Sequence, residues 1–262
     1  MNIILCANHR AGYEALFTLL SREFASEASL VVFTHENDES KPIIDACKKL
    51  GIKYFCENIN YHSDLVATFE PDIILSCYYR FIIKENILSS AKRGCLNVHP
   101  SLLPYYKGTF STPWAIINEE KQTGVSIHEM VKDVDMGKII MQSSIDIRSN
   151  DTAYSLYHRL VTLAIQMLPS ALEVFSQGYK GKPQDLPKDS SKLYFSRKLP
   201  FDGILNVDDI SYIQGCNFIR AMYFPPHQGA QFRLRDGSLL EANHESDILP
   251  IADQFHKRGT LL

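Results

Sequence analysis

The stretch Leu96–Gly108, with the sequence LNVHPSLLPYYKG, predicts a strand followed by a stiff loop. Leu96 to His99 suits the end of a buried strand, and Pro100 stops it because proline cannot donate a ladder hydrogen bond. Asn97 and His99 are two residues apart, so their side chains leave the same face of the strand. An amide can donate to an oxyanion, and an imidazole titrates near neutral pH. At the carboxyl end of a strand in an α/β sheet, such a pair faces the ligand crevice.

Apolar strands alternate with helical segments around this stretch. The predicted strands are 2–7, 30–34, 53–56, 72–77 and 94–99, and the predicted helices are 12–24, 41–50, 63–69 and 84–90. This alternation predicts an α/β fold, a Rossmann-like, doubly wound and mostly parallel sheet with helices on both faces. The loop after the first strand has one glycine, Gly12, which is too few for a dinucleotide fingerprint.

The later part of the chain divides by composition. A helix over 112–120, strands over 125–130 and 138–147, and a long helix over 152–177 complete the first domain, which we place at 1–178. A segment rich in Gly, Pro and Lys follows, so 179–203 is predicted to be a connection. The remaining region, 204–262, is predicted to be a small appendage of one helix and a β-hairpin that turns at Asp236-Gly237.

Composition argues against several classes of protein. The net charge of -3 gives no field that favours nucleic acid or an anionic membrane. No apolar run approaches the roughly 20 residues that span a bilayer, and no signal peptide is expected. The six cysteines show no CxxC or zinc spacing, which is typical of free thiols in a cytoplasmic protein. We expect a cytoplasmic homodimer without nucleic-acid or membrane partners.

A second pattern lies downstream of Leu96–Gly108. It begins at Thr123-Gly124-Val125 and closes at Asp135-Met136-Gly137. Together the two patterns resemble the signature of the 10-formyltetrahydrofolate-dependent formyltransferases. This resemblance implies that Asn97, His99 and Asp135 are catalytic. The residue types suit acyl transfer to an amine, with Asn97 donating to the oxyanion, His99 accepting the amine proton and Asp135 stabilising the imidazolium.

The resemblance covers almost the first 200 residues and is greatest with the sugar-nucleotide N-formyltransferases. It implies that 10-formyltetrahydrofolate is the formyl donor. The residues implied to hold the folate are Phe81, Ile82, Ile83, Val131, Lys132, Asp133 and Val134. For the nucleotide sugar, cations can meet a pyrophosphate and aromatic rings can stack on a base, so the candidates are Arg10, Tyr78, Tyr79 and Arg197. Solvated arginines and half-buried tyrosines are an equal alternative at these four positions.

Several alternatives concern the acceptor and the site. The short appendage favours a dTDP-linked amino sugar, dTDP-4-amino-4,6-dideoxyglucose, used in O-antigen synthesis. The formyltransferase that acts on glycinamide ribonucleotide opens with a Gly/Ser-rich phosphate loop, which this chain lacks. Methionyl-tRNA is a poor fit for the C-terminal region 200–262, which has five Lys/Arg and eight Asp/Glu. A non-catalytic folate- or nucleotide-binding regulator on the same fold is a further alternative. Zinc held by His99, His128 and Asp135 is disfavoured by the spacing, so no metal is expected.

Overall fold

The computed structural model describes residues 1–21, 29–186, 194–195 and 198–256. The chain forms two compact units, which we call unit 1 and unit 2. Unit 1 contains 1–104, 125–143 and 161–188, and unit 2 contains 105–124, 144–160 and 189–262. The segments of the two units therefore alternate along the chain. The division into consecutive segments 1–178, 179–203 and 204–262 stays a prediction.

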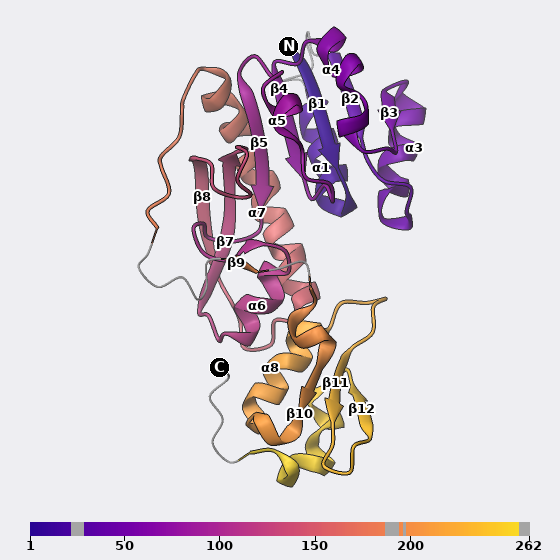
Figure 1. The fold of residues 1–262 in the computed structure, drawn as a ribbon, viewed down its shortest axis with the longest axis vertical. Coiled ribbons are helices and arrows are strands. Elements are labelled where there is room, and N and C mark those ends of the chain that lie inside the picture. Colours follow the sequence, from indigo (N-terminus) through magenta and orange to yellow (C-terminus); the bar gives the residue numbers. More distant parts are fainter. Residues whose placement is uncertain (22–28, 187–193, 196–197, 257–262) are drawn as a thin grey trace. The chain divides into compact units, whose positions relative to one another are not determined.

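A seven-stranded sheet with the order β3-β2-β1-β4-β5-β7-β8 is the centre of the fold (Figure 1). The first five strands are parallel, and β7 is antiparallel to β5. The strands are β1 (Asn2–Ala7), β2 (Ser29–Phe33), β3 (Lys53–Phe55), β4 (Ile73–Cys77), β5 (Gly94–His99), β7 (Gln122–Glu129) and β8 (Ile139–Asp146). The predicted α/β class and mostly parallel sheet are confirmed.

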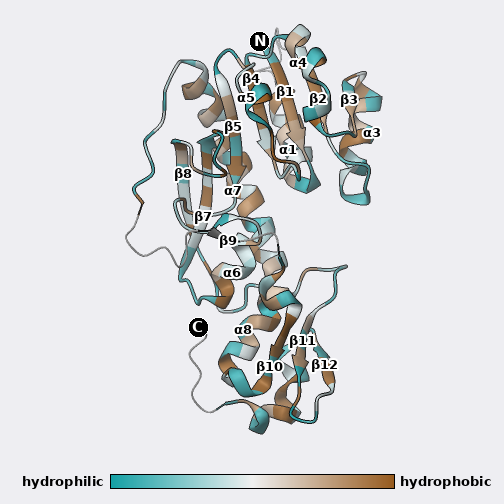
Figure 2. Cartoon of the chain, viewed as in Figure 1, coloured by the Kyte–Doolittle hydropathy of each residue, from teal (hydrophilic) through white to brown (hydrophobic). Residues whose placement is uncertain are grey.

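The central strands are buried on both faces, which explains their continuous apolar sequences. Ile3 to Ala7 in β1 and Ile73 to Leu75 in β4 are fully buried, and these strands are mainly brown in Figure 2. A cluster of apolar side chains from β1, β2 and β4 includes Ile83, which lies in the loop after β4. This packing fixes the carboxyl ends of the strands, where the predicted site residues lie.

The helices follow the predicted positions with small shifts. They are α1 (His9–Leu19), α3 (Lys41–Leu50), α4 (Ser63–Phe69), α5 (Glu85–Leu88), α6 (Ser111–Ile117), α7 (Ala153–Ser176) and α8 (Tyr212–Met222). Helix α1 begins three residues before the predicted start, so Gly12 lies inside it. A Cβ on Gly12 would lie 2.7 Å from the Cβ of Ala7, so this glycine allows α1 to pack closely on β1. None of the helices in the described ranges is long and apolar enough to cross a membrane.

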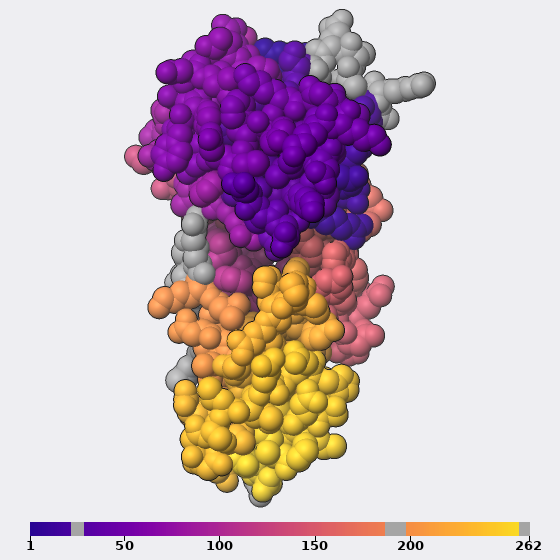
Figure 3. All heavy atoms as spheres, turned by 90° about the vertical axis from the view of Figure 1, so that its right-hand side faces the viewer, coloured from indigo at the N-terminus to yellow at the C-terminus, as the bar shows by residue number. Residues whose placement is uncertain are grey.

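Unit 2 has its own small sheet and a polar network. Strand β11 (Ala230–Arg233) pairs antiparallel with β12 (Leu239–Ala242) and parallel with β10 (Ile204–Asn206). The predicted hairpin is confirmed, whereas the three-residue β10 was not predicted. A further pair joins β6 (Lys107–Gly108) to β9 (Tyr194–Phe195). Figure 3 shows the C-terminal residues, orange to yellow, as a continuous packed body.

Arg220 anchors α8 within unit 2. Its guanidinium donates to the backbone oxygen of Asp151 at 2.9 Å and to the side chain of Asn217 at 2.7 Å. Asn217 in turn donates to Glu119 at 3.0 Å. These bonds join α8 to the segments that follow α6 and precede α7.

Candidate active site

Asn97 and His128 face each other across the antiparallel pair β5–β7. The Nδ2 atom of Asn97 lies 3.2 Å from Nε2 of His128, and Nδ1 of His128 lies 2.9 Å from the carbonyl oxygen of Glu129. A carbonyl oxygen only accepts, so Nδ1 carries a proton, and in the neutral ring Nε2 accepts from the Asn97 amide. His128 thereby orients the amide nitrogen of Asn97.

Asp135 reaches the same place from the loop after β7. Its φ of 54° is left-handed, a conformation that Asp tolerates better than most residues. Gln184 holds this loop, because its side-chain amide donates to the carbonyl oxygens of Asp135 at 2.7 Å and Gly137 at 2.8 Å. A Cβ on Gly137 would lie 1.8 Å from the carbonyl oxygen of Glu129, so only glycine fits there. The Asp-x-Gly pattern therefore has a steric reason.

The structure brings the three predicted catalytic side chains together. His99 Nδ1 lies 3.6 Å from one carboxylate oxygen of Asp135, and both side chains are buried, with 5% and 8% exposed. The other carboxylate oxygen lies 3.4 Å from His128 Nε2 and 3.5 Å from Asn97 Nδ2. A carboxylate in this position can stabilise the imidazolium that forms when His99 accepts a proton. The group can therefore accept a proton at His99 while an amide N–H of Asn97 meets a developing negative charge.

The loop after β5 is held by β7 and β8. Ser126 accepts a hydrogen bond from the backbone N–H of Leu103 at 3.0 Å and donates to the carbonyl oxygen of Ser101 at 2.6 Å. Gln142 on β8 donates to Ser126 and to the carbonyl oxygen of Leu103 at 2.7 and 2.9 Å. The backbone of the loop that follows His99 is therefore fixed by these two side chains.

Two loops of unit 1 carry the predicted folate residues. Phe81, Ile82, Val131 and Val134 expose between 37% and 55% of their surface, so each loop presents two apolar side chains to solvent. The loops lie side by side, since Lys132 Nζ is 3.9 Å from the Glu85 carboxylate. Exposed apolar side chains can pack against the flat ring of a pterin, and the assignment of these residues to folate stays a prediction.

The remaining folate candidates have other surroundings. The side chain of Ile83 is buried in the core cluster and anchors its loop. Asn60 accepts from the backbone N–H of Lys84 and donates to the carbonyl oxygen of Ile82, both at 2.8 Å. Asp133 accepts from the backbone N–H of Met136 through its carbonyl oxygen at 3.3 Å, inside the Asp135 loop.

Three of the four nucleotide-sugar candidates lie within the described residues. Arg10 is in the first turn of α1 and lies 3.4 Å from Glu14, and Tyr78 has a left-handed φ of 58° directly after β4. The hydroxyl of Tyr79 donates to the carbonyl oxygen of Glu57 and accepts from the N–H of Ile59, both at 3.1 Å, so this tyrosine also supports the fold. Arg197 lies outside the described residues.

His35, which the sequence did not suggest, supports the Phe81 loop. Its Nε2 accepts from the backbone N–H of Arg80 at 3.1 Å, and its ring lies 4.9 Å from Tyr79 and 5.0 Å from Phe81. Burial, together with the positive charges of Arg80 and His9, lowers the pKa of His35 to about 4. The neutral ring is the form that can accept from Arg80. A histidine two residues after the end of β2 was the only available signal.

The His, Cys, Asp and Glu side chains of the described residues do not form a metal site. No group of three or more such side chains in the described ranges has an arrangement that could hold a metal ion.

Comparisons with known proteins identify the family of this chain. Residues 28–172, which include all three catalytic candidates, match the Formyl transferase family. The GDP-perosamine N-formyltransferase of Brucella melitensis biotype 1 is 42% identical over 213 residues, 80% of each chain.

Solved structures share the fold. A sugar N-formyltransferase from Shewanella sp FDAARGOS_354 has a TM-score of 0.71 at 19% identity, covering 100% of this chain and 99% of its own. An N-formyltransferase from Helicobacter canadensis, solved with folinic acid and dTDP-3-aminofucose, has a TM-score of 0.66 at 24% identity, covering 87% and 82%. With the Asn97–His99–Asp135 geometry, the family match and the sequence relative, the chain belongs to the formyl transferase family and is an N-formyltransferase.

Proposed function

We propose that the protein transfers the formyl group of 10-formyltetrahydrofolate to the amino group of a sugar carried on a nucleoside diphosphate. The observation that carries this proposal is the approach of His99 to Asp135 at 3.6 Å, beside the amide of Asn97. With a proton on Nδ1 facing Asp135, the lone pair of His99 is on Nε2, which accepts the proton of the attacking amine. Asn97 donates to the oxygen that gains negative charge, and Asp135 stabilises the imidazolium.

The nucleotide is the finer part of the proposal. The sequence favoured a dTDP-linked sugar, whereas the 42% identical relative is named for GDP-perosamine. We therefore place a GDP-linked amino sugar first, with dTDP-linked and UDP-linked sugars as its competitors. A cytoplasmic homodimer that serves O-antigen synthesis stays the prediction for the cellular setting.

A mass-spectrometric transfer assay tests the proposal. The protein is incubated with 10-formyltetrahydrofolate and amino sugars carried on GDP, dTDP or UDP, and each sugar is examined for the mass of a formyl group. Glycinamide ribonucleotide serves as a different amine acceptor, and the Asn97→Ala/His99→Ala double variant controls for uncatalysed transfer. We expect a gain on a nucleotide sugar that depends on both residues. Binding of folate and nucleotide without any transfer would instead support the regulator.

A further inference from the structure

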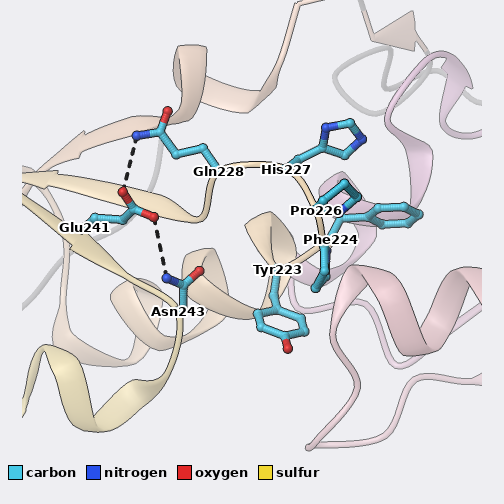
Figure 4. A pocket seen from close by; sticks show the side chains of 8 residues that line it. Tyr223, Phe224, Pro226, His227, Gln228, Glu241 and Asn243 are labelled. Carbon is cyan, nitrogen blue, oxygen red and sulfur yellow. Dashed lines mark hydrogen bonds between the residues drawn. The ribbon is translucent and has the colours of Figure 1, made fainter. Parts of the chain in front are cut away.

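A pocket of about 450 Å³ lies on unit 2, between the segment after α8 and the hairpin β11–β12 (Figure 4). Neither the family match nor the catalytic group accounts for it, because its lining begins at Tyr223 and the family match ends at residue 172. The lining combines aromatic rings, two prolines, two amides and one carboxylate. Small-molecule sites commonly combine apolar and aromatic side chains with a few polar groups.

The hairpin contributes a carboxylate held between two amides. Glu241 and Asn243 are two residues apart along β12 and its end, so they lie on the same face. Asn243 Nδ2 donates to one carboxylate oxygen of Glu241 at 3.5 Å, and Gln228 Nε2 donates to the other at 3.4 Å. A carboxylate has about four acceptor positions, which lie in its own plane, so two remain after these bonds.

The backbone around this carboxylate is also fixed. A Cβ on Gly229 would lie 2.2 Å from Oδ1 of Asn243, so the buried glycine makes room for that side chain. The backbone N–H of Asn243 donates to the Asp247 carboxylate at 2.9 Å. This bond, with a second from the N–H of His244, lowers the pKa of Asp247. The amide side of the pocket is therefore defined by packing and hydrogen bonds.

The segment after α8 contributes flat apolar groups. The ring of Phe224 packs edge-on against Tyr157 at 5.3 Å and Tyr154 at 5.6 Å, which anchors the segment to the start of α7. Pro225 and Pro226 follow with φ angles that their rings fix. Tyr223 and His227 also line the pocket; in Figure 4 the Tyr223 ring lies toward Glu241 and Asn243, whereas the rings of Phe224 and His227 point to the opposite side. The Tyr223 ring can stack on a heterocycle.

The donor and acceptor pattern selects among the bases. Guanine presents two adjacent N–H donors, N1–H and the 2-amino group, on one edge, and a carboxylate can accept both. Thymine and uracil place one N–H between two carbonyl oxygens, and adenine places a ring nitrogen beside its amino group. In each of these bases an acceptor atom would therefore face an acceptor oxygen of the carboxylate, which is unfavourable. Charge-assisted bonds to a carboxylate are about twice as strong as neutral ones, which increases this discrimination.

We propose that this pocket binds the guanine base of a guanine nucleotide, with Glu241 as the residue that determines base specificity. When the bound nucleotide is the carrier of the acceptor sugar, this inference rests on the proposed function and identifies GDP as that carrier. Free GDP, which presents the same base, is the second ligand that this pocket could bind.

Calorimetric titration with GDP, IDP and dTDP tests the pocket without turnover. IDP lacks only the 2-amino group of guanine. For the wild-type protein we expect GDP to bind about 10-fold more tightly than IDP or dTDP. In Glu241→Gln we expect a loss of about 10-fold for GDP and equal affinities for GDP and IDP, because an amide offers a donor where guanine needs an acceptor. Glu245→Gln, which removes an equal charge outside the pocket, should bind like the wild type.

Two outcomes would overturn the proposal: equal binding of GDP and IDP by the wild type, or unchanged GDP affinity in Glu241→Gln. Steady-state kinetics then distinguish a GDP-linked sugar from free GDP as the ligand. A raised KM for a GDP-linked sugar with unchanged kcat in Glu241→Gln assigns the pocket to the acceptor, and an unchanged KM assigns it to free GDP. His99→Ala separates this proposal from the proposed function, because that variant should bind GDP normally while losing transfer.

Discussion

His128 lies directly opposite Asn97 in the β5–β7 pair, and its Nε2 faces both the Asn97 amide and a carboxylate oxygen of Asp135, at 3.2 and 3.4 Å. The protonation of this ring decides which partner it bonds. The neutral ring accepts from Asn97, whereas the protonated ring donates to Asp135. His128 is therefore a positioning residue for the donor amide as well as a neighbour of the carboxylate.

Replacement of His128 should lower turnover through Asn97. We expect His128→Ala to reduce kcat about 10-fold, with little change in KM for the formyl donor, because the amide loses the bond that directs it. His128→Gln, whose side-chain oxygen can accept from Asn97, should retain more activity than His128→Ala. Steady-state kinetics on both variants, with thermal melts to exclude unfolding, measure the difference. Equal kcat in the two variants would mean that the ring only fills space.

The catalytic residues should act as one unit. Asn97→Ala and His99→Ala are each expected to lose on the order of 100-fold or more in kcat, since each removes a group that is needed only in the transition state. The double variant should be little worse than the poorer single variant. His244→Ala, at an exposed histidine of unit 2, is the matched control and should retain full kcat. Near-normal turnover in both single variants would remove these residues from the mechanism.

Gly137→Ala should disrupt the Asp135 loop. The new methyl group would lie 1.8 Å from the carbonyl oxygen of Glu129, so the backbone must move and Asp135 moves with it. We expect a destabilisation of about 2 kcal/mol and a loss of most of kcat. Gly51→Ala is the control, because Gly51 has a positive φ of 67° but nothing within 4 Å of an added Cβ. It should lower the melting temperature and leave kcat unchanged, whereas an unchanged kcat in Gly137→Ala would contradict the steric argument.

His35 should make the fold less stable in acid. Its pKa is lowered to about 4 in the folded protein, against about 6.5 in an unfolded chain. Between these pH values the unfolded state binds a proton at His35 that the folded state does not bind. The free energy of unfolding is therefore unaffected by this group above pH 6.5 and falls as the pH decreases toward 4. The loss at His35 is on the order of 3 kcal/mol at the acid end, from about 1.4 kcal/mol per pH unit.

Urea unfolding of wild type and His35→Gln across this pH range measures the effect. The glutamine side chain has an oxygen that can accept from the N–H of Arg80 but does not titrate in this range. The stability of the variant should therefore fall less between pH 6.5 and 4 than that of the wild type. Parallel curves would show that His35 does not contribute to the acid sensitivity.

Local sequence patterns predicted much of the fold, for identifiable reasons. The bounds of α3 and α4 agree with the prediction because a left-handed Gly51 ends the first and Pro71 follows the second. Asn97 and His99 could be paired because residues two apart share a strand face. Strands β6, β9 and β10 have two or three residues each and form only through pairing with distant segments, which leaves no periodicity to detect.

The rest of the site depends on tertiary contacts. Gln184 holds the Asp135 loop from a segment that the composition marked only as a connection. The placement of His128 opposite Asn97 follows from the register of β5 and β7, which no local pattern specifies. The Glu241 pocket likewise depends on a hairpin register that places Gln228 near Asn243, so the sequence suggested a hairpin there but no ligand.

The alternation of the two units along the chain limits how this protein can be shortened or recombined. A cut after residue 178 would leave 105–124 and 144–160, which belong to unit 2, attached to unit 1. Those orphaned segments would lose Asn217 as the partner of Glu119 and Arg220 as the partner of the Asp151 carbonyl. An exchange of C-terminal regions between relatives must therefore transfer three separate pieces of chain together, and a simple tail swap would create two incomplete bodies.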